Sequence, residues 1–207
     1  CLLAGAINGL GSIFYYLALA RIPASVGQML YSTYPLFLTV WLILDHQPPD
    51  RLTLFRILIA TLAVVFLTLT NNSGVDLIGA LMMLIASALF ALHLPINQRI
   101  LYEIPAPTVT LYTLSAMSAV VIPAYLMFDH SLPGQGAAWG AVAWLTLVTV
   151  LSRLTLFFGV KHLGGIRAAL LGLTELLATI VFSHLWLGET LTSIQWVGTI
   201  LLCLSLG

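Results

Sequence analysis

The sequence predicts an all-α membrane protein, a polytopic bundle of eight transmembrane helices. Of its 207 residues, 60% are apolar and only 7% are charged. A soluble domain carries about 25% charged residues, so this chain cannot cover a water-facing surface. The formal net charge of zero gives no long-range attraction for phosphates, which argues against nucleic-acid binding. The composition therefore places the chain in a lipid bilayer.

The individual helices follow from the apolar runs. A bilayer core of about 30 Å needs about 20 apolar residues in a helix. Eight such runs cover residues 1–19, 24–44, 52–69, 75–95, 108–128, 138–160, 166–187 and 191–206. Turn residues separate them, such as Gln47-Pro48-Pro49-Asp50 and Asn71-Asn72-Ser73-Gly74. No loop between these runs is long enough for a soluble domain, so we expect the chain to act within the membrane or at its faces.

The first run allows an alternative, because Ala18-Leu19-Ala20 has the form of a signal-peptide cleavage site. No basic residues precede this run and it lacks an initiator Met, so we interpret it as a membrane span. Basic residues in the short loops predict the orientation. One side carries only Arg21, and the other carries Arg51, Arg56, Arg99, Lys161 and Arg167. We expect the second side and both chain ends to be cytoplasmic.

Two parts of the chain are similar to each other. A shift of about 140 residues aligns the first three runs with the last three, and pairs Tyr34 with Glu175. The fourth and fifth runs lie between the copies, so the natural unit has five helices, and an odd number places the copies in opposite orientations. We therefore expect residues 1–70 to be the last three helices of a first repeat. Residues 75–207 would form a complete second repeat, in a parent of ten helices whose first two are missing here.

Short motifs support this organisation. The stretch 24–37 contains Tyr34-Pro35, and the stretch 166–177 is followed by Gly188-Glu189-Thr190-Leu191-Thr192. These motifs resemble the EamA-type repeats of the drug/metabolite transporter superfamily, which have a Glu-Pro or Tyr-Pro in mid-helix and a Gly-Glu-x-Leu-Thr turn. The chain departs from that pattern at Glu175, which no proline follows, and at Gln47-Pro48-Pro49-Asp50, which replaces Gly-Glu.

This resemblance implies ten helices around a central substrate cavity. It also implies export or exchange of small organic metabolites, such as amino acids, across a bacterial cytoplasmic (inner) membrane. The expected partners are a small-molecule substrate and the lipid bilayer, and no nucleic acid is expected. The sequence does not decide whether the protein forms a homodimer. The resemblance does not name the substrate, because the substrates of the superfamily range from amino acids to sugars and drugs.

Two charged residues fall in the middle of predicted spans, where charges are costly and therefore candidates for function. Arg153 and Glu175 flank the predicted hairpin at Gly164-Gly165, and each lies about 16 Å from this turn. We expect both to face one cavity, where they pair with each other or bind the charged ends of a zwitterionic substrate. The alternative is a structural ion pair that holds the two helices together.

The second run is too polar to face lipid. It contains Gln28, Tyr31 and Tyr34, followed by Pro35, which frees the carbonyl group of Tyr31. We expect the helix to bend there and to turn these polar groups toward a cavity. Pro35 and the pair Gly164, Gly165 are the expected hinges. The alternative for the polar side chains is hydrogen bonding between helices without substrate contact.

Tyr16, Phe157 and His93 complete the candidate substrate-binding set. Aromatic walls suit an apolar or aromatic metabolite, although plain core packing is the simpler interpretation of Tyr16 and Phe157. His93 lies near the predicted cytoplasmic end of its run, where packing or gating is favoured over proton coupling. The small residues of Gly5-x-x-x-Gly9 and Gly136-x-x-x-Gly140 are interpreted as helix packing within the monomer.

Other functional classes fit less well. Haem would need two histidines at one depth, but the best embedded ones, His93 and His184, lie near opposite faces. The sequence has no G-x-S-x-G motif, which would point to a serine protease. It also has no cluster of acidic or histidine residues of the kind that acyl or phosphoryl transfer uses. We therefore expect no enzyme activity, no cofactor and no metal. The remaining alternative is a structural or assembly-scaffolding protein, which would be packed shut where a transporter has a polar cavity.

Overall fold

The computed structural model describes residues 1–22, 24–47, 49–68, 76–128, 139–175, 177–178, 196–197, 200–201 and 204. Within these ranges the regular structure is helical, as the sequence predicts. The helices are α1 (Leu2–Leu19), α2 (Ala24–Tyr31), α3 (Tyr34–Leu44), α4 (Arg51–Thr68), α5 (Leu77–Leu101), α6 (Ala106–Phe128), α7 (Trp139–Leu163) and α8 (Gly165–Gly172). Most of the predicted final run, 191–206, and His184 lie outside the described residues.

Four helices of the described part are long and apolar enough to cross a membrane. They are α1, α5, α7 and the Ala106–Met127 portion of α6. Their outward surfaces carry large apolar side chains, including Leu81, Leu111 and Trp144, which are each more than half exposed. Lipid tails are the environment that stabilises such a surface, because water would not solvate it. Eight spans were expected from the sequence, and four are found among the described helices.

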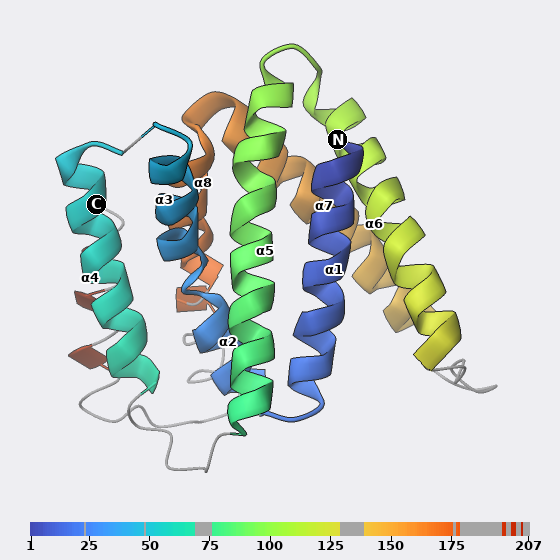
Figure 1. Ribbon diagram of the computed structural model, residues 1–207, viewed down its shortest axis with the longest axis horizontal. Coiled ribbons are helices and arrows are strands. Elements are labelled where there is room, and N and C mark those ends of the chain that lie inside the picture. Colours follow the sequence, from blue (N-terminus) through green and yellow to red (C-terminus); the bar gives the residue numbers. More distant parts are fainter. Residues whose placement is uncertain are drawn as a thin grey trace.

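Helix α1 packs closely against α5 and α6 (Figure 1). The close approach depends on residues without large side chains. A Cβ atom on Gly5 would lie 2.5 Å from the backbone oxygen of Thr113, and one on Gly9 would lie 3.0 Å from the Cβ of Val120. Small residues of this kind let two backbones approach within a membrane. The predicted packing of Gly5 and Gly9 within the monomer is therefore confirmed. The same prediction for Gly140 finds no described atom within 4 Å, and Gly136 lies outside the described residues.

The second apolar run is interrupted where one helix with a bend was expected. Helix α2 ends at Tyr31 and α3 begins at Tyr34, so Ser32 and Thr33 separate them. Pro35 has no N–H to donate to the carbonyl of Tyr31. The hydroxyl of Ser87 on α5 donates to this carbonyl instead, at 2.9 Å. The break is stable because a neighbouring helix satisfies the freed backbone group.

Helix α5 lies centrally in the described bundle, between α1 and the α2–α3 pair (Figure 1). Asp76 caps its N-terminus: the Asp76 side chain accepts a hydrogen bond from the backbone N–H of Ile78 at 3.0 Å. The predicted run ends at Pro95, but the helix continues to Leu101. A single proline removes one hydrogen bond, and the residues after it still favour a helix.

The close approach of α1 and α6 predicts the effect of a matched pair of substitutions. Gly5→Ala should destabilise the protein by about 1–3 kcal/mol, because the new methyl group would overlap the α6 backbone. Gly140→Ala adds the same methyl group where no atom of the described residues lies within 4 Å. It should leave stability unchanged or raise it by about 0.5–1 kcal/mol through helix propensity. Thermal unfolding in detergent measures both, and equal midpoints for the two variants would contradict the packing argument.

The break between α2 and α3 predicts a second effect. Ser87→Ala removes the hydroxyl that satisfies the Tyr31 carbonyl, and the loss of a buried partner costs about 1–3 kcal/mol. Ser118→Ala is the control, because Ser118 lies exposed on α6. Unfolding midpoints in detergent should fall for Ser87→Ala alone. A midpoint that matches the control would show that the carbonyl does not need this partner.

Candidate binding cavity

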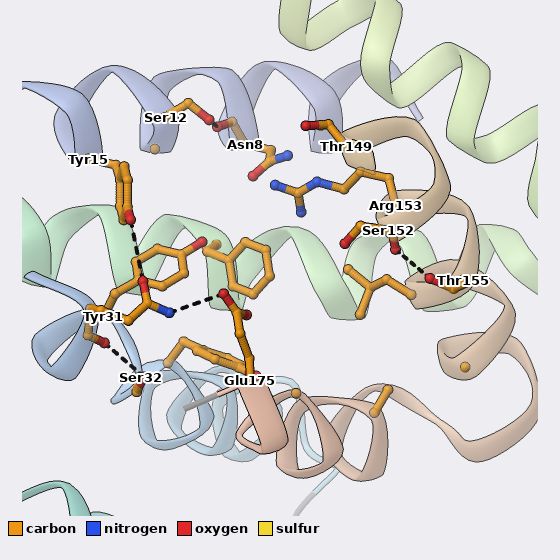
Figure 2. A pocket seen from close by; sticks show the side chains of 18 of the residues that line it. Asn8, Ser12, Tyr15, Tyr31, Ser32, Thr149, Ser152, Arg153, Thr155 and Glu175 are labelled. Carbon is orange, nitrogen blue, oxygen red and sulfur yellow. Dashed lines mark hydrogen bonds between the residues drawn. The ribbon is translucent and has the colours of Figure 1, made fainter. Parts of the chain in front are cut away.

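A cavity of about 810 Å³ lies among α1, α2, α3, α5, α6, α7 and α8. It is at mid-length of the long helices, because Phe90 and Arg153 are both near the middle of their 25-residue helices. Ten of the side chains that line it are labelled in Figure 2. The described lining residues with polar groups are Asn8, Ser12, Tyr15, Tyr16, Gln28, Tyr31, Ser32, Tyr34, Thr149, Ser152, Arg153, Thr155, Thr174 and Glu175. A hollow with apolar walls and several polar groups suits a small ligand that has both polar and apolar parts.

The acidic part of the cavity is centred on Glu175, which follows the end of α8. The side-chain amide of Gln28 on α2 donates to Glu175 Oε1 at 3.3 Å. The carbonyl oxygen of the same amide accepts from the hydroxyl of Tyr15 on α1, also at 3.3 Å. Figure 2 shows these two hydrogen bonds as dashed lines that lead from Tyr15 to Glu175. These two hydrogen bonds connect α1 and α2 to the carboxylate that follows α8.

The basic part of the cavity is centred on Arg153, which projects from α7. Its guanidinium carbon lies 5.3 Å from the centroid of the Phe90 ring on α5, within the range of a cation–π interaction. Figure 2 shows the guanidinium group directed toward Asn8 of α1. Arg153 and Glu175 therefore reach the same cavity from different helices. Among the described residues of the lining, these are the two with formal charges, and the charges are of opposite sign.

Aromatic rings form the wall between these two charged groups. Tyr31 contacts Phe90 with ring centroids 5.3 Å apart, and Tyr34 contacts Phe90 at 5.1 Å. The hydroxyl of Tyr34 donates to the backbone carbonyl of Ala169 at 2.7 Å. Tyr34 is only 8% exposed, and its ring lines the cavity. Its hydroxyl is already bound to α8. It connects the α3 side of the cavity to α8.

The other predicted aromatic and histidine residues are less central. Tyr16 lines the cavity from α1 but is 66% exposed. Phe157 and His93 are fully buried and lie behind the wall, outside the lining. The His93 ring packs near Phe90 and Phe157, and its Nδ1 atom is hydrogen-bonded to the Phe90 carbonyl. The structure therefore gives His93 a packing position next to the cavity.

The expected hinges lie at helix ends. Pro35 is in the first turn of α3, and Gly164 separates α7 from α8 with a φ of 85°, a conformation that favours glycine. The backbone N–H of Gly165 donates to Gln98 Oε1 on α5 at 2.8 Å. A Cβ atom on Gly165 would lie 2.7 Å from that oxygen, so a larger residue would make the Gln98 side chain shift.

A smaller hollow of about 280 Å³ lies beside this turn, and its lining includes Asp50, Gln98 and Arg167. The Thr53 hydroxyl donates to the Asp50 carboxylate and lowers the pKa of this carboxyl. Nearby, Arg99 on α5 pairs with Asp45 at the end of α3. Among the described residues no group of His, Cys, Asp or Glu is arranged to hold a metal ion.

Sequence reasoning missed several lining residues. Asn8 and Ser12 on α1 both line the cavity, as do Thr149 and Ser152 on α7. In each pair the two residues are three or four positions apart, so they share a helix face. A polar stripe within an otherwise apolar run was therefore a signal that could have identified them. Single polar residues are common in membrane helices, which is why the stripe is weak evidence by itself.

Comparisons with known proteins relate this sequence to transporters. The profile of the EamA-like transporter family matches residues 77–207. The "Uncharacterized transporter YcbK" of Bacillus subtilis is 25% identical to this chain, over 91% of this chain and 64% of its own length. The "Uncharacterized transporter sll1319" of Synechocystis is 24% identical, over 94% of this chain and 61% of its own length. The chain thus spans less than two thirds of either relative.

A solved crystal structure has the same fold. It superposes with a TM-score of 0.77 at 17% sequence identity, and the match covers 98% of this chain and 72% of the other. At this level of identity the likeness concerns the arrangement of helices and carries no information about a ligand.

Proposed function

Because the chain belongs to the EamA-like transporter family, within the drug/metabolite transporter superfamily, we propose that it carries small organic metabolites such as amino acids across the cytoplasmic membrane. Transport would proceed by alternating access, as export or exchange. Family membership and the apolar helices make it an integral membrane protein. The relatives are named as transporters, which agrees with a protein that is not an enzyme.

The observation that carries this proposal is the mid-depth cavity with one cationic and one anionic side chain. Arg153 and Glu175 both line it, together with a set of uncharged polar groups. Charged residues at mid-membrane are costly and are retained where they serve a ligand or an ion. A cavity with charges of both signs suits a zwitterion. We propose that Arg153 binds a carboxylate and that Glu175 binds an ammonium group of the same molecule.

The arrangement of the helices supports alternating access. In the proposed organisation, residues 1–70 are the last three helices of one repeat and 75–207 are the second repeat, in inverted orientation. The cavity is lined by α1 to α3 from the first and by α5 to α8 from the second. Rocking of one repeat against the other would expose the site to each side in turn. In this proposal the 207 residues form eight transmembrane helices, and both ends of the chain lie on the cytoplasmic side.

A scaffolding role without transport is the alternative. A scaffold gains stability from close packing and has no use for a polar hollow of about 810 Å³ at mid-depth. The cavity therefore favours the transporter.

A transport assay with matched substrates tests the proposal. Full-length protein in lipid vesicles would be given an amino acid, the corresponding amine without a carboxylate, and the corresponding acid without an amine. Glu175→Gln and Arg153→Gln should each lower transport of the amino acid at least about tenfold, since each removes a charged hydrogen-bond partner. Glu175→Gln should affect the amine more than the acid, and Arg153→Gln the acid more than the amine.

Two substitutions outside the cavity serve as controls. Glu103 and Lys161 are exposed charged residues that do not line the cavity. Glu103→Gln and Lys161→Gln should transport like the unmodified protein. Equal transport by the cavity variants and these controls, at equal expression, would reject the role of the cavity.

A further inference from the structure

We propose that Tyr15 is a positioning residue that determines affinity for the ammonium end of the substrate, by holding Gln28 against Glu175. The inference rests on the proposed function of the cavity. Its basis is the pair of hydrogen bonds in which the Tyr15 hydroxyl donates to Gln28 Oε1 and the Gln28 amide donates to Glu175 Oε1, both at 3.3 Å. Figure 2 shows this series of contacts across the cavity wall.

The Gln28 side chain is flexible unless its amide is held in place. A glutamine side chain has three rotatable bonds, and fixing it costs about 1.5–2 kcal/mol in lost rotamer freedom. Its amide also presents a donor on one side and an acceptor on the other. Tyr15 binds the acceptor, so the donor is left pointing to the carboxylate. Gln28 is thereby held at both ends in one orientation before any substrate arrives.

Tyr15 itself must be rigid to hold another residue. Its ring packs edge-on against Tyr31, with centroids 5.1 Å apart and planes at 76°. It also packs edge-on against Tyr16, with centroids 5.5 Å apart and planes at 89°. At the other end, the Ser32 hydroxyl donates to the backbone carbonyl of Gln28 at 2.8 Å and fixes the last turn of α2. Side chain and backbone of Gln28 are both anchored.

The hydrogen bond from Gln28 orients the Glu175 carboxylate. A donor held against Glu175 Oε1 favours one position of this carboxylate, and hydrogen bonds in series reinforce each other. An ammonium group that enters the cavity then meets an acceptor that is already oriented, and less entropy is lost on binding. Tyr15 acts through Gln28, because its own hydroxyl proton is committed to the Gln28 carbonyl. The group recognised at this end is a protonated amine.

The experiment is a double-mutant cycle in the full-length protein. Tyr15→Phe, Gln28→Leu and the double variant would be compared for KM and kcat with an amino acid and with the matched acid that lacks the amine. Tyr15→Phe should raise KM for the amino acid about fivefold, the effect of one hydrogen bond, with kcat unchanged. KM for the acid should stay the same. Tyr112→Phe is the control, because Tyr112 is exposed on α6 and does not line the cavity.

The cycle separates positioning from direct contact. If Tyr15 acts through Gln28, adding Tyr15→Phe to Gln28→Leu should change KM less than about twofold. Multiplicative effects of the two substitutions on KM would overturn the proposal and make Tyr15 a direct contact of the substrate. A Tyr15→Phe variant with the KM of the Tyr112→Phe control would overturn it as well.

A second readout does not depend on transport. Thermal unfolding midpoints of the unmodified protein, Tyr15→Phe, Gln28→Leu and the double variant measure whether Tyr15 and Gln28 are coupled. We expect the decrease in midpoint of the double variant to be smaller than the sum of the two single decreases. Additive midpoints would overturn the hydrogen-bond series even if transport is normal. If the unmodified protein transports no member of the substrate panel, the proposed function fails and the role of Tyr15 in affinity fails with it. Coupled midpoints would then identify that outcome as a failure of the function and not of the contacts.

Discussion

The structure depends on the requirement that every backbone polar group released within the bilayer finds a partner. Pro35 cannot donate to the carbonyl of Tyr31, and a backbone carbonyl left without a partner inside the bilayer is costly. Ser87 provides the partner from α5, at 2.9 Å. The interruption between α2 and α3 can therefore exist only where these helices contact α5. This contact fixes the position of α2, and with it the positions of Gln28 and Tyr31 in the cavity wall.

The same requirement applies to charge. Arg153 and Glu175 would be costly at mid-depth if either faced lipid. The cavity gives both a polar surrounding, and the Phe90 ring and the Gln28 amide give each a specific neighbour. Ion pairs at the ends of the bundle, Arg21 with Asp76 and Arg99 with Asp45, are substantially exposed. Exposed pairs contribute little to stability, so the helices are held mainly by packing.

Packing and polarity meet on one part of α1. Gly5 and Gly9 bring α1 against α6. Asn8 and Ser12 lie beside these glycines at helical spacing and, with Tyr15, line the cavity. A single helix thus joins a closely packed region to the candidate binding site. In a transporter this combination gives a rigid wall beside the more broken α2–α3 segment, where a change of shape would cost fewer helical hydrogen bonds.

The sequence alone determined the all-helical membrane class, because the length and spacing of apolar runs follow directly from the thickness of the bilayer. It also indicated Arg153, Glu175 and a bend near Pro35, since charges and prolines in apolar runs are locally visible. Only the tertiary structure decided that Ser87 completes the break, that the Tyr34 hydroxyl binds α8, and that His93 and Phe157 lie behind the wall. These are contacts between segments about 50 to 140 residues apart. They depend on the rotation of each helix about its axis, and uniformly apolar runs leave this rotation undetermined until the helices pack.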